Sequence, residues 1–114
     1  MTSHELLKAT ARSLVERLAR GEYETVIAES SASRLTTDEL RDVVREYGRT
    51  LVAPPETAYQ DLDAVAVRGA TPPTWSVRAP LWTKEEGKSD LTLELTVVLN
   101  EDRASFELDD LHVL

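Results

Sequence analysis

The spacing of apolar residues changes once along this 114-residue chain, and that change constrains the fold more than any other feature. Before Pro54-Pro55 the apolar residues recur every three or four positions, which is the period of an amphipathic helix. After the two prolines, which cannot continue a helix, apolar and polar residues alternate as they do in strands with one buried face. We therefore predict a single α+β domain over residues 1–114, with N-terminal helices packed against a curved, mostly antiparallel four-stranded sheet.

The first half predicts three helices, at about residues 3–20, 22–29 and 37–47. The start of the third helix is the most sharply defined. Thr36 and Glu39 have the spacing of a capping box, and Leu35 and Leu40 occupy the positions of a hydrophobic staple. Gly48 follows the last apolar residue of this helix, where a left-handed residue commonly ends one.

The second half predicts four strands, at about residues 59–68, 74–82, 90–99 and 103–113. The third strand carries the strongest pattern, because leucine or valine occupies every second position from Leu91 to Leu99. Pro72-Pro73 and Asn100-Glu101-Asp102 supply the turns before and after the two central strands. The sheet is therefore expected to be a meander with one apolar face and one polar face.

Charge and composition exclude several classes of function. The formal charge is −8, and from Trp82 to Leu114 nine acidic residues stand against three basic ones. Such a chain repels a nucleic-acid backbone, so we predict no nucleic-acid partner. No run of apolar residues approaches the roughly 20 that a membrane span needs. The absence of cysteine and of a secretion signal at the start favours a cytoplasmic location.

Two longer segments resemble an uncharacterised bacterial domain family of unknown function. They are Tyr47-Gly48-Arg49-Thr50-Leu51 and the stretch from Leu81 to Glu94, LWTKEEGKSDLTLE. The closing Asp109-Asp110-Leu111-His112-Val113-Leu114 is similar to the same family. At the level of element order, the chain also resembles the nuclear transport factor 2-like superfold. That resemblance implies a cone in which the sheet wraps around the helices, with dimerisation through the sheet as an option, but it implies no activity.

The segment after the second strand predicts a partner-binding hairpin, because a tryptophan beside charged residues is a common interface anchor. The candidate residues are Trp82, Lys84, Glu85, Glu86, Lys88 and Asp90. Alternatively, Trp82 covers the open end of the cone while the lysines pair with the neighbouring acids. We predict a non-catalytic cytosolic binding module for a protein partner, for which a basic partner suits the charge. An immunity-type protein that blocks a basic toxin domain is one concrete version, and an accessory protein is another.

The alternative function is a small-molecule binder or an isomerase- or cyclase-like enzyme that uses the cone cavity. Its candidate residues are Tyr23, Tyr47, Trp75, Arg78, Asp109 and His112. A histidine at the end of a strand is more often satisfied by a neighbour than poised as a general base. The carboxylates near His112 match no metal-binding loop, and no nucleophile is spaced with a base. We therefore predict no catalytic residue, no metal and no cofactor.

Overall fold

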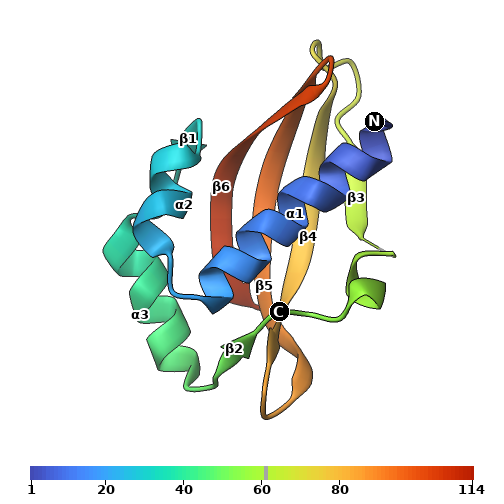
Figure 1. Cartoon of the computed structure of the whole chain (residues 1–114). Coiled ribbons are helices and arrows are strands. Elements are labelled where there is room, and N and C mark those ends of the chain that lie inside the picture. The colour runs from blue at the N-terminus through green and yellow to red at the C-terminus, as the bar shows by residue number, and fades with distance from the viewer. Residues whose placement is uncertain (61) are drawn as a thin grey trace.

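Three α-helices and a six-stranded sheet form the described part of the chain, residues 1–60 and 62–114 of the computed structural model (Figure 1). The helices are α1 (Ser3–Ala19), α2 (Tyr23–Glu29) and α3 (Thr37–Tyr47), with a short 3-10 helix, η1, at Glu56–Tyr59. The strands are β1 (Ala32–Ser33), β2 (Leu51–Val52), β3 (Asp63–Ala66), β4 (Thr74–Thr83), β5 (Gly87–Asn100) and β6 (Arg103–Val113). The α+β class agrees with the prediction from the sequence.

The prediction of four strands is wrong for the described residues, which form six. The two additional strands, β1 and β2, are two residues long and are too short to show an alternating pattern. The first predicted strand, at about 59–68, is also shorter than expected and spans Asp63–Ala66. Its expected beginning includes Tyr59, which ends η1 instead.

The ends of the helices are set by local side-chain hydrogen bonds. The side chain of Thr36 accepts from the backbone amide of Glu39, and the Glu39 side chain accepts from the amide of Thr36, which completes the capping box of α3. Gly48 ends α3 with a left-handed φ of 73°. At the start of α1, Thr2 accepts from the amide of Glu5 at 3.1 Å. Gly48 ends α3 shortly before β2 begins at Leu51, so residues 48–50 connect the two elements.

The strands of the sheet follow the order β1-β6-β5-β4-β2, and β3 also pairs with β4. β1 runs parallel to β6, whereas the other pairs are antiparallel. β6 therefore lies inside the sheet, between β1 and β5, although every other element precedes it in the chain. α2 and α3 pack against each other, and α3 contacts β6 beside this end of the sheet (Figure 1).

Helix α1 crosses one face of the sheet and forms the core with it (Figure 1). Its buried face consists of Leu6, Leu7, Ala11, Leu14, Val15 and Leu18. The facing sheet residues are all buried as well: Val77, Ala79, Leu81, Leu91, Leu93, Leu95, Val97, Leu108 and Leu111. Apolar side chains thus occupy the space between α1 and the sheet.

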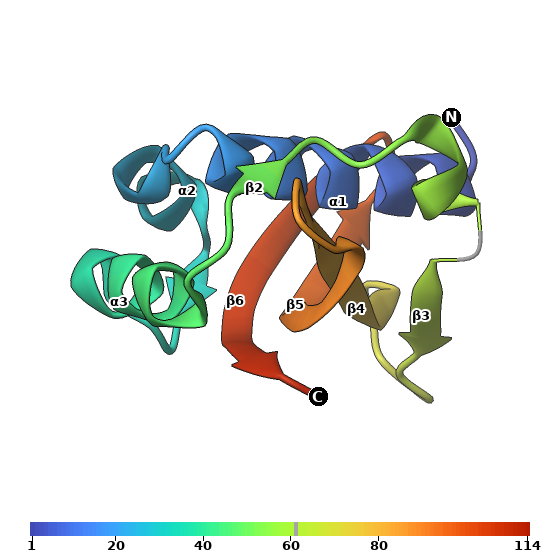
Figure 2. The ribbon, with the colours of Figure 1, turned by 90° about the horizontal axis from the view of Figure 1, so that it is seen from below.

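No helix of the described chain lies over the opposite face of the sheet, which we call the helix-free face (Figure 2). Side chains alternate along a strand, so the polar positions of β5, including Glu94 and Thr96, belong to this face. The described helices also include none that is long and apolar enough to span a membrane.

Candidate functional site

The turn between β4 and β5 is shaped by Thr83 and Gly87. The hydroxyl of buried Thr83 accepts a 2.9 Å hydrogen bond from the backbone amide of Glu86. Gly87 adopts a φ of +76°, a conformation that side chains with a Cβ rarely adopt. The ring of Trp82 packs beside Gly87, 3.8 Å from where a Cβ would stand. Together these residues present a charged tip at residues 84–86.

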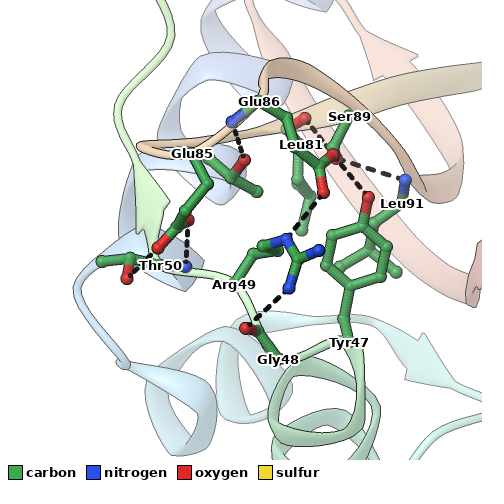
Figure 3. Close-up of polar contacts among 10 residues, drawn as sticks. Tyr47, Gly48, Arg49, Thr50, Leu81, Glu85, Glu86, Ser89 and Leu91 are labelled. Carbon is green, nitrogen blue, oxygen red and sulfur yellow. Dashed lines mark hydrogen bonds and ion pairs between the residues drawn. The ribbon is translucent and has the colours of Figure 1, made fainter.

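The tip does not extend freely from the fold, because Glu85 binds the segment before β2 (Figure 3). Its carboxylate accepts hydrogen bonds from the backbone amide of Thr50 at 2.8 Å and from the Thr50 hydroxyl at 2.9 Å. The Thr50 amide, followed by the hydroxyl, holds the pKa of Glu85 below its ordinary value. The backbone amide of Lys84 donates to the Thr50 carbonyl, at 2.8 Å, while the Lys84 residue is exposed.

The second tip carboxylate, that of Glu86, binds the end of α3 (Figure 3). It accepts a hydrogen bond from the Tyr47 hydroxyl at 2.7 Å and forms an ion pair with Arg49 at 3.2 Å. The hydrogen bond to Glu86 raises the pKa of Tyr47. We call these contacts, made by Tyr47, Arg49, Thr50, Glu85 and Glu86, the clasp. The two segments that suggested a family resemblance therefore contact each other.

Beyond the tip, β5 bulges before it rejoins β4. Pro80 pairs with Thr92, and two residues later Trp82 pairs with Lys88, so three residues of β5 stand opposite one residue of β4. Buried Ser89 stabilises the bulge: its hydroxyl donates to the Leu81 carbonyl at 2.7 Å (Figure 3). The bulge interrupts the regular β4–β5 ladder beside a groove.

This groove has a volume of about 440 Å³ and lies between residues 54–60 and 62–63, β4 and the start of β5. Three of the predicted hairpin residues line it, namely Trp82, Lys88 and Asp90, whereas the tip residues do not. The remaining lining residues are Pro54, Thr57, Ala58, Tyr59, Leu62, Asp63, Arg78, Ala79, Pro80, Ser89, Thr92 and Leu114. The volume falls within the range of about 300–1,000 Å³ that is typical of ligand pockets.

The residues predicted for a cone cavity do not surround one space. Tyr23, Tyr47 and Trp75 are partly buried and pack against the hydrophobic core. Tyr23 also lies beneath the guanidinium of Arg41, 5.6 Å from the ring centre. The other three predicted residues, Arg78, Asp109 and His112, belong to the polar face of the sheet.

The helix-free face carries a cluster of polar side chains from β4, β5 and β6. The Nε2 of His112 lies 2.7 Å from Oε2 of Glu94 and 3.9 Å from Oδ2 of Asp110. Arg78 donates to the other oxygen of Glu94, Oε1, at 3.1 Å. We call Glu94, Asp110 and His112 the carboxylate–histidine cluster. All three residues are half-buried.

A second bulge, in β6, sets the geometry of this cluster. Leu95 pairs with Leu108, but the next pair is Glu94 with Asp110, so Asp109 is the additional residue. The Asp109 carboxylate accepts from the Thr96 hydroxyl at 2.7 Å, and Asp110 takes the position opposite Glu94. Sequence reasoning placed Asp109 and Asp110 near His112 but did not include Glu94. The alternation of β5 was the signal that placed Glu94 on the same face.

A family model for a domain of unknown function, DUF7668, matches residues 15–114. The chain belongs to this family. The DUF7668 match begins inside α1 and runs through β6, so it includes the clasp, the groove and the carboxylate–histidine cluster. No curated protein and no solved structure matches the chain.

Proposed function

We propose that the chain is a non-catalytic cytosolic binding module that docks a basic protein partner in the groove beside the β4–β5 hairpin. The observation that carries this proposal is the groove itself. It combines apolar and charged side chains at the edge of β4, between η1 and the helix-free face. Trp82, Pro80 and Leu114 supply apolar walls, and the charged lining residues are Asp63, Asp90, Arg78 and Lys88.

The charge of the surrounding face supports a basic partner. The carboxylates on or beside the helix-free face are Asp63, Glu94, Glu107, Asp109 and Asp110. Of the cations on this face, Arg78 is paired with Glu94, and Lys88 and Arg103 lie on the exposed side of β5 and β6. The whole chain carries a formal charge of −8, so its field attracts a cationic protein over a Debye length of about 8–10 Å.

Because the clasp already binds the carboxylates at the tip of the hairpin, we place the proposed partner contact on the flank of the hairpin. The carboxylate of Glu85 binds Thr50, and that of Glu86 binds Tyr47 and Arg49. These contacts hold the hairpin against the end of α3 and the segment before β2. Trp82 is better placed as an anchor, because a half-buried aromatic residue in a groove contributes a large contact area. Lys88 and Asp90 then form the rim.

The same proposal includes a nuclear transport factor 2-like relationship, which the order of three helices followed by a meander supports. An immunity-type protein that blocks a basic toxin domain is the concrete version that the negative charge favours. One alternative to a different protein partner is a second copy of the chain, which would occupy the groove by docking on the helix-free face. The groove is also large enough for a small molecule, which makes a small-molecule binder the second alternative.

The test compares Leu114→Ala with Val113→Ala, using the full chain as bait and then the captured partner in binding kinetics. The two side chains are adjacent and similarly exposed, at 63% and 56%, but only Leu114 lines the groove. Leu114→Ala should weaken binding about five- to tenfold, and Trp82→Ala about 30-fold or more, whereas Val113→Ala should stay within about twofold. Association should also slow as the salt concentration rises.

Equal effects of the two C-terminal substitutions would exclude the groove as the docking site. Association rates that do not respond to salt would exclude the electrostatic part of the proposal. Light scattering of the pure chain addresses the competing occupant, because a dimer that dissociates in Leu114→Ala would assign the groove to a second copy. Binding of a small metabolite that displaces the captured partner would favour the small-molecule alternative.

A further inference from the structure

We propose that the carboxylate–histidine cluster of Glu94, Asp110 and His112 binds a divalent transition-metal cation of the Zn²⁺ class. None of these three residues lines the groove proposed to dock a partner, although the neighbouring Arg78 does, and the inference does not depend on that proposal. One atom from each residue, an imidazole nitrogen or a carboxylate oxygen, lies within 4.8 Å of the other two. An imidazole with two carboxylates is a donor set that Zn²⁺ and its neighbours in the first transition row accept.

The separations of the donor atoms are close to those of a coordination shell. Metal bonds of about 2.1 Å in a tetrahedral arrangement place neighbouring ligand atoms about 3.4 Å apart. The Nε2 of His112 lies 2.7 Å from the Glu94 oxygen and 3.9 Å from the Asp110 oxygen, on either side of that value. Small side-chain rotations are therefore enough to bring the three atoms around one ion.

Each carboxylate already has one oxygen fixed and the other turned toward the imidazole. Arg78 holds Oε1 of Glu94 at 3.1 Å, which leaves Oε2 facing His112. The backbone amide of Leu111 holds Oδ1 of Asp110 at 2.8 Å, which leaves Oδ2 facing the same nitrogen. Hydrogen bonds of this kind, from groups outside the ligand set, orient metal ligands in proteins.

Without a cation, the two carboxylate oxygens that face His112 share one hydrogen-bond donor. The Nε2 of His112 can carry a single proton, and the closer acceptor is Glu94. Among the described residues, no hydrogen-bond donor reaches Oδ2 of Asp110, although that oxygen faces the cluster. A cation bound by neutral His112 satisfies both carboxylate oxygens at once, whereas a proton on Nε2 satisfies one.

The backbone holds the three ligands on rigid elements. Glu94 and Asp110 are direct partners across β5 and β6, and His112 pairs with the β5 residue two positions from Glu94, Thr92. The side chains of Glu94, Asp110 and His112 remain 26%, 49% and 38% exposed, so an ion can reach them from solvent. Solvent or a partner group can complete the coordination.

Isothermal titration of the full chain with Zn²⁺ tests this inference. We expect one ion per chain, and we expect His112→Ala and Asp110→Asn each to weaken binding at least about tenfold. The matched control is His4→Ala, because the chain has two histidines and His4 is exposed at the beginning of α1. This variant should bind Zn²⁺ as the wild type does. Glu107→Gln controls for the general acidity of the same face.

Two further measurements keep the test decisive if one variant folds poorly. In wild-type chain, the NMR signals of the His112 ring should shift on addition of Zn²⁺ while those of His4 stay unchanged. Mg²⁺, which prefers oxygen ligands, should bind much more weakly than Zn²⁺. The inference is overturned by wild type that does not bind millimolar Zn²⁺, by loss of binding in His4→Ala, or by full binding in His112→Ala. Equal affinity for Mg²⁺ would also overturn it.

Discussion

Replacing Leu95 with alanine should destabilise the fold more than any change on the opposite face of the same strand. Leu95 is fully buried in the middle of β5, where it pairs with Val77 on one side and Leu108 on the other. Loss of three carbon groups at about 0.8 kcal/mol each removes about 2.4 kcal/mol of transfer free energy. The residual cavity adds to this, so the total should be about 3 kcal/mol, within the 2–5 kcal/mol typical of such changes.

Calorimetry should detect this loss of stability as a fall in the midpoint temperature of unfolding, Tm. For 114 residues, an unfolding entropy of about 2.1 cal/mol/K per residue predicts a fall in Tm of about 12 °C for Leu95→Ala. The control is Val98→Ala, on the same strand but half-exposed on the helix-free face, which should cost under about 1 kcal/mol and 4 °C. Similar losses in the two variants would refute the assignment of the buried face, and so would a loss under about 1 kcal/mol for Leu95→Ala.

Three other predictions concern the caps, the clasp and a buried hydroxyl. Thr36→Ala should lower the free energy of unfolding in urea by about 1 kcal/mol, because α3 loses its capping oxygen, and a change of only a few tenths would contradict this. Because hydrogen bonds from Thr50 depress the pKa of Glu85, its contribution to stability should be present above the ordinary value of 4.5 and disappear as the pH falls through the lowered pKa. Glu85→Gln should therefore flatten the acid limb of a plot of Tm against pH, and an unaltered limb would argue against the clasp. Tyr59→Phe should leave stability unchanged or raise it by about 1 kcal/mol, since among the described residues the buried Tyr59 hydroxyl has no hydrogen-bond partner; a loss above about 1 kcal/mol would reveal one. Burial also raises the pKa of Tyr59 to about 12, which an absorbance titration of wild type against Tyr59→Phe measures.

Local patterns were sufficient to predict the helices and long strands. The capping box of Thr36 and Glu39 depends only on residues three positions apart, and the structure contains both of its hydrogen bonds. The alternation from Leu91 to Leu99 likewise depends on one strand with one buried face. In contrast, β1 and β2 exist because neighbouring edges offer them partners, so two-residue segments gave no signal of their own.

The clasp was not predictable, because its partners are 35 and 39 residues apart along the chain. The charged run of the hairpin suggested carboxylates that bind a partner or pair with the neighbouring lysines, whereas Glu85 and Glu86 each accept from a donor at the end of α3 or just beyond it. Periodicity describes which face a residue occupies, but it does not state which distant loop will lie against a turn.

The carboxylate–histidine cluster illustrates how one inserted residue changes a register. The hairpin that pairs Asn100 with Arg103 would, if regular, place Glu94 opposite Asp109. The bulge at Asp109 shifts this partner to Asp110 and brings His112 opposite Thr92. No local residue pattern predicted that bulge. The sequence therefore predicted which residues lie on the polar face of the sheet, but not which of them contact one another.

The position of β6 in the sheet has a consequence for biosynthesis. The ribosome makes β6 after β1, β4 and β5, yet this strand lies between β1 and β5 and supplies buried Leu108 and Leu111. A nascent chain that lacks β6 exposes the unpaired edge of β5 and leaves α3 without one of its contacts. Because partly folded chains with open edges are prone to aggregation, the unfinished domain should depend on chaperones until its final strand emerges.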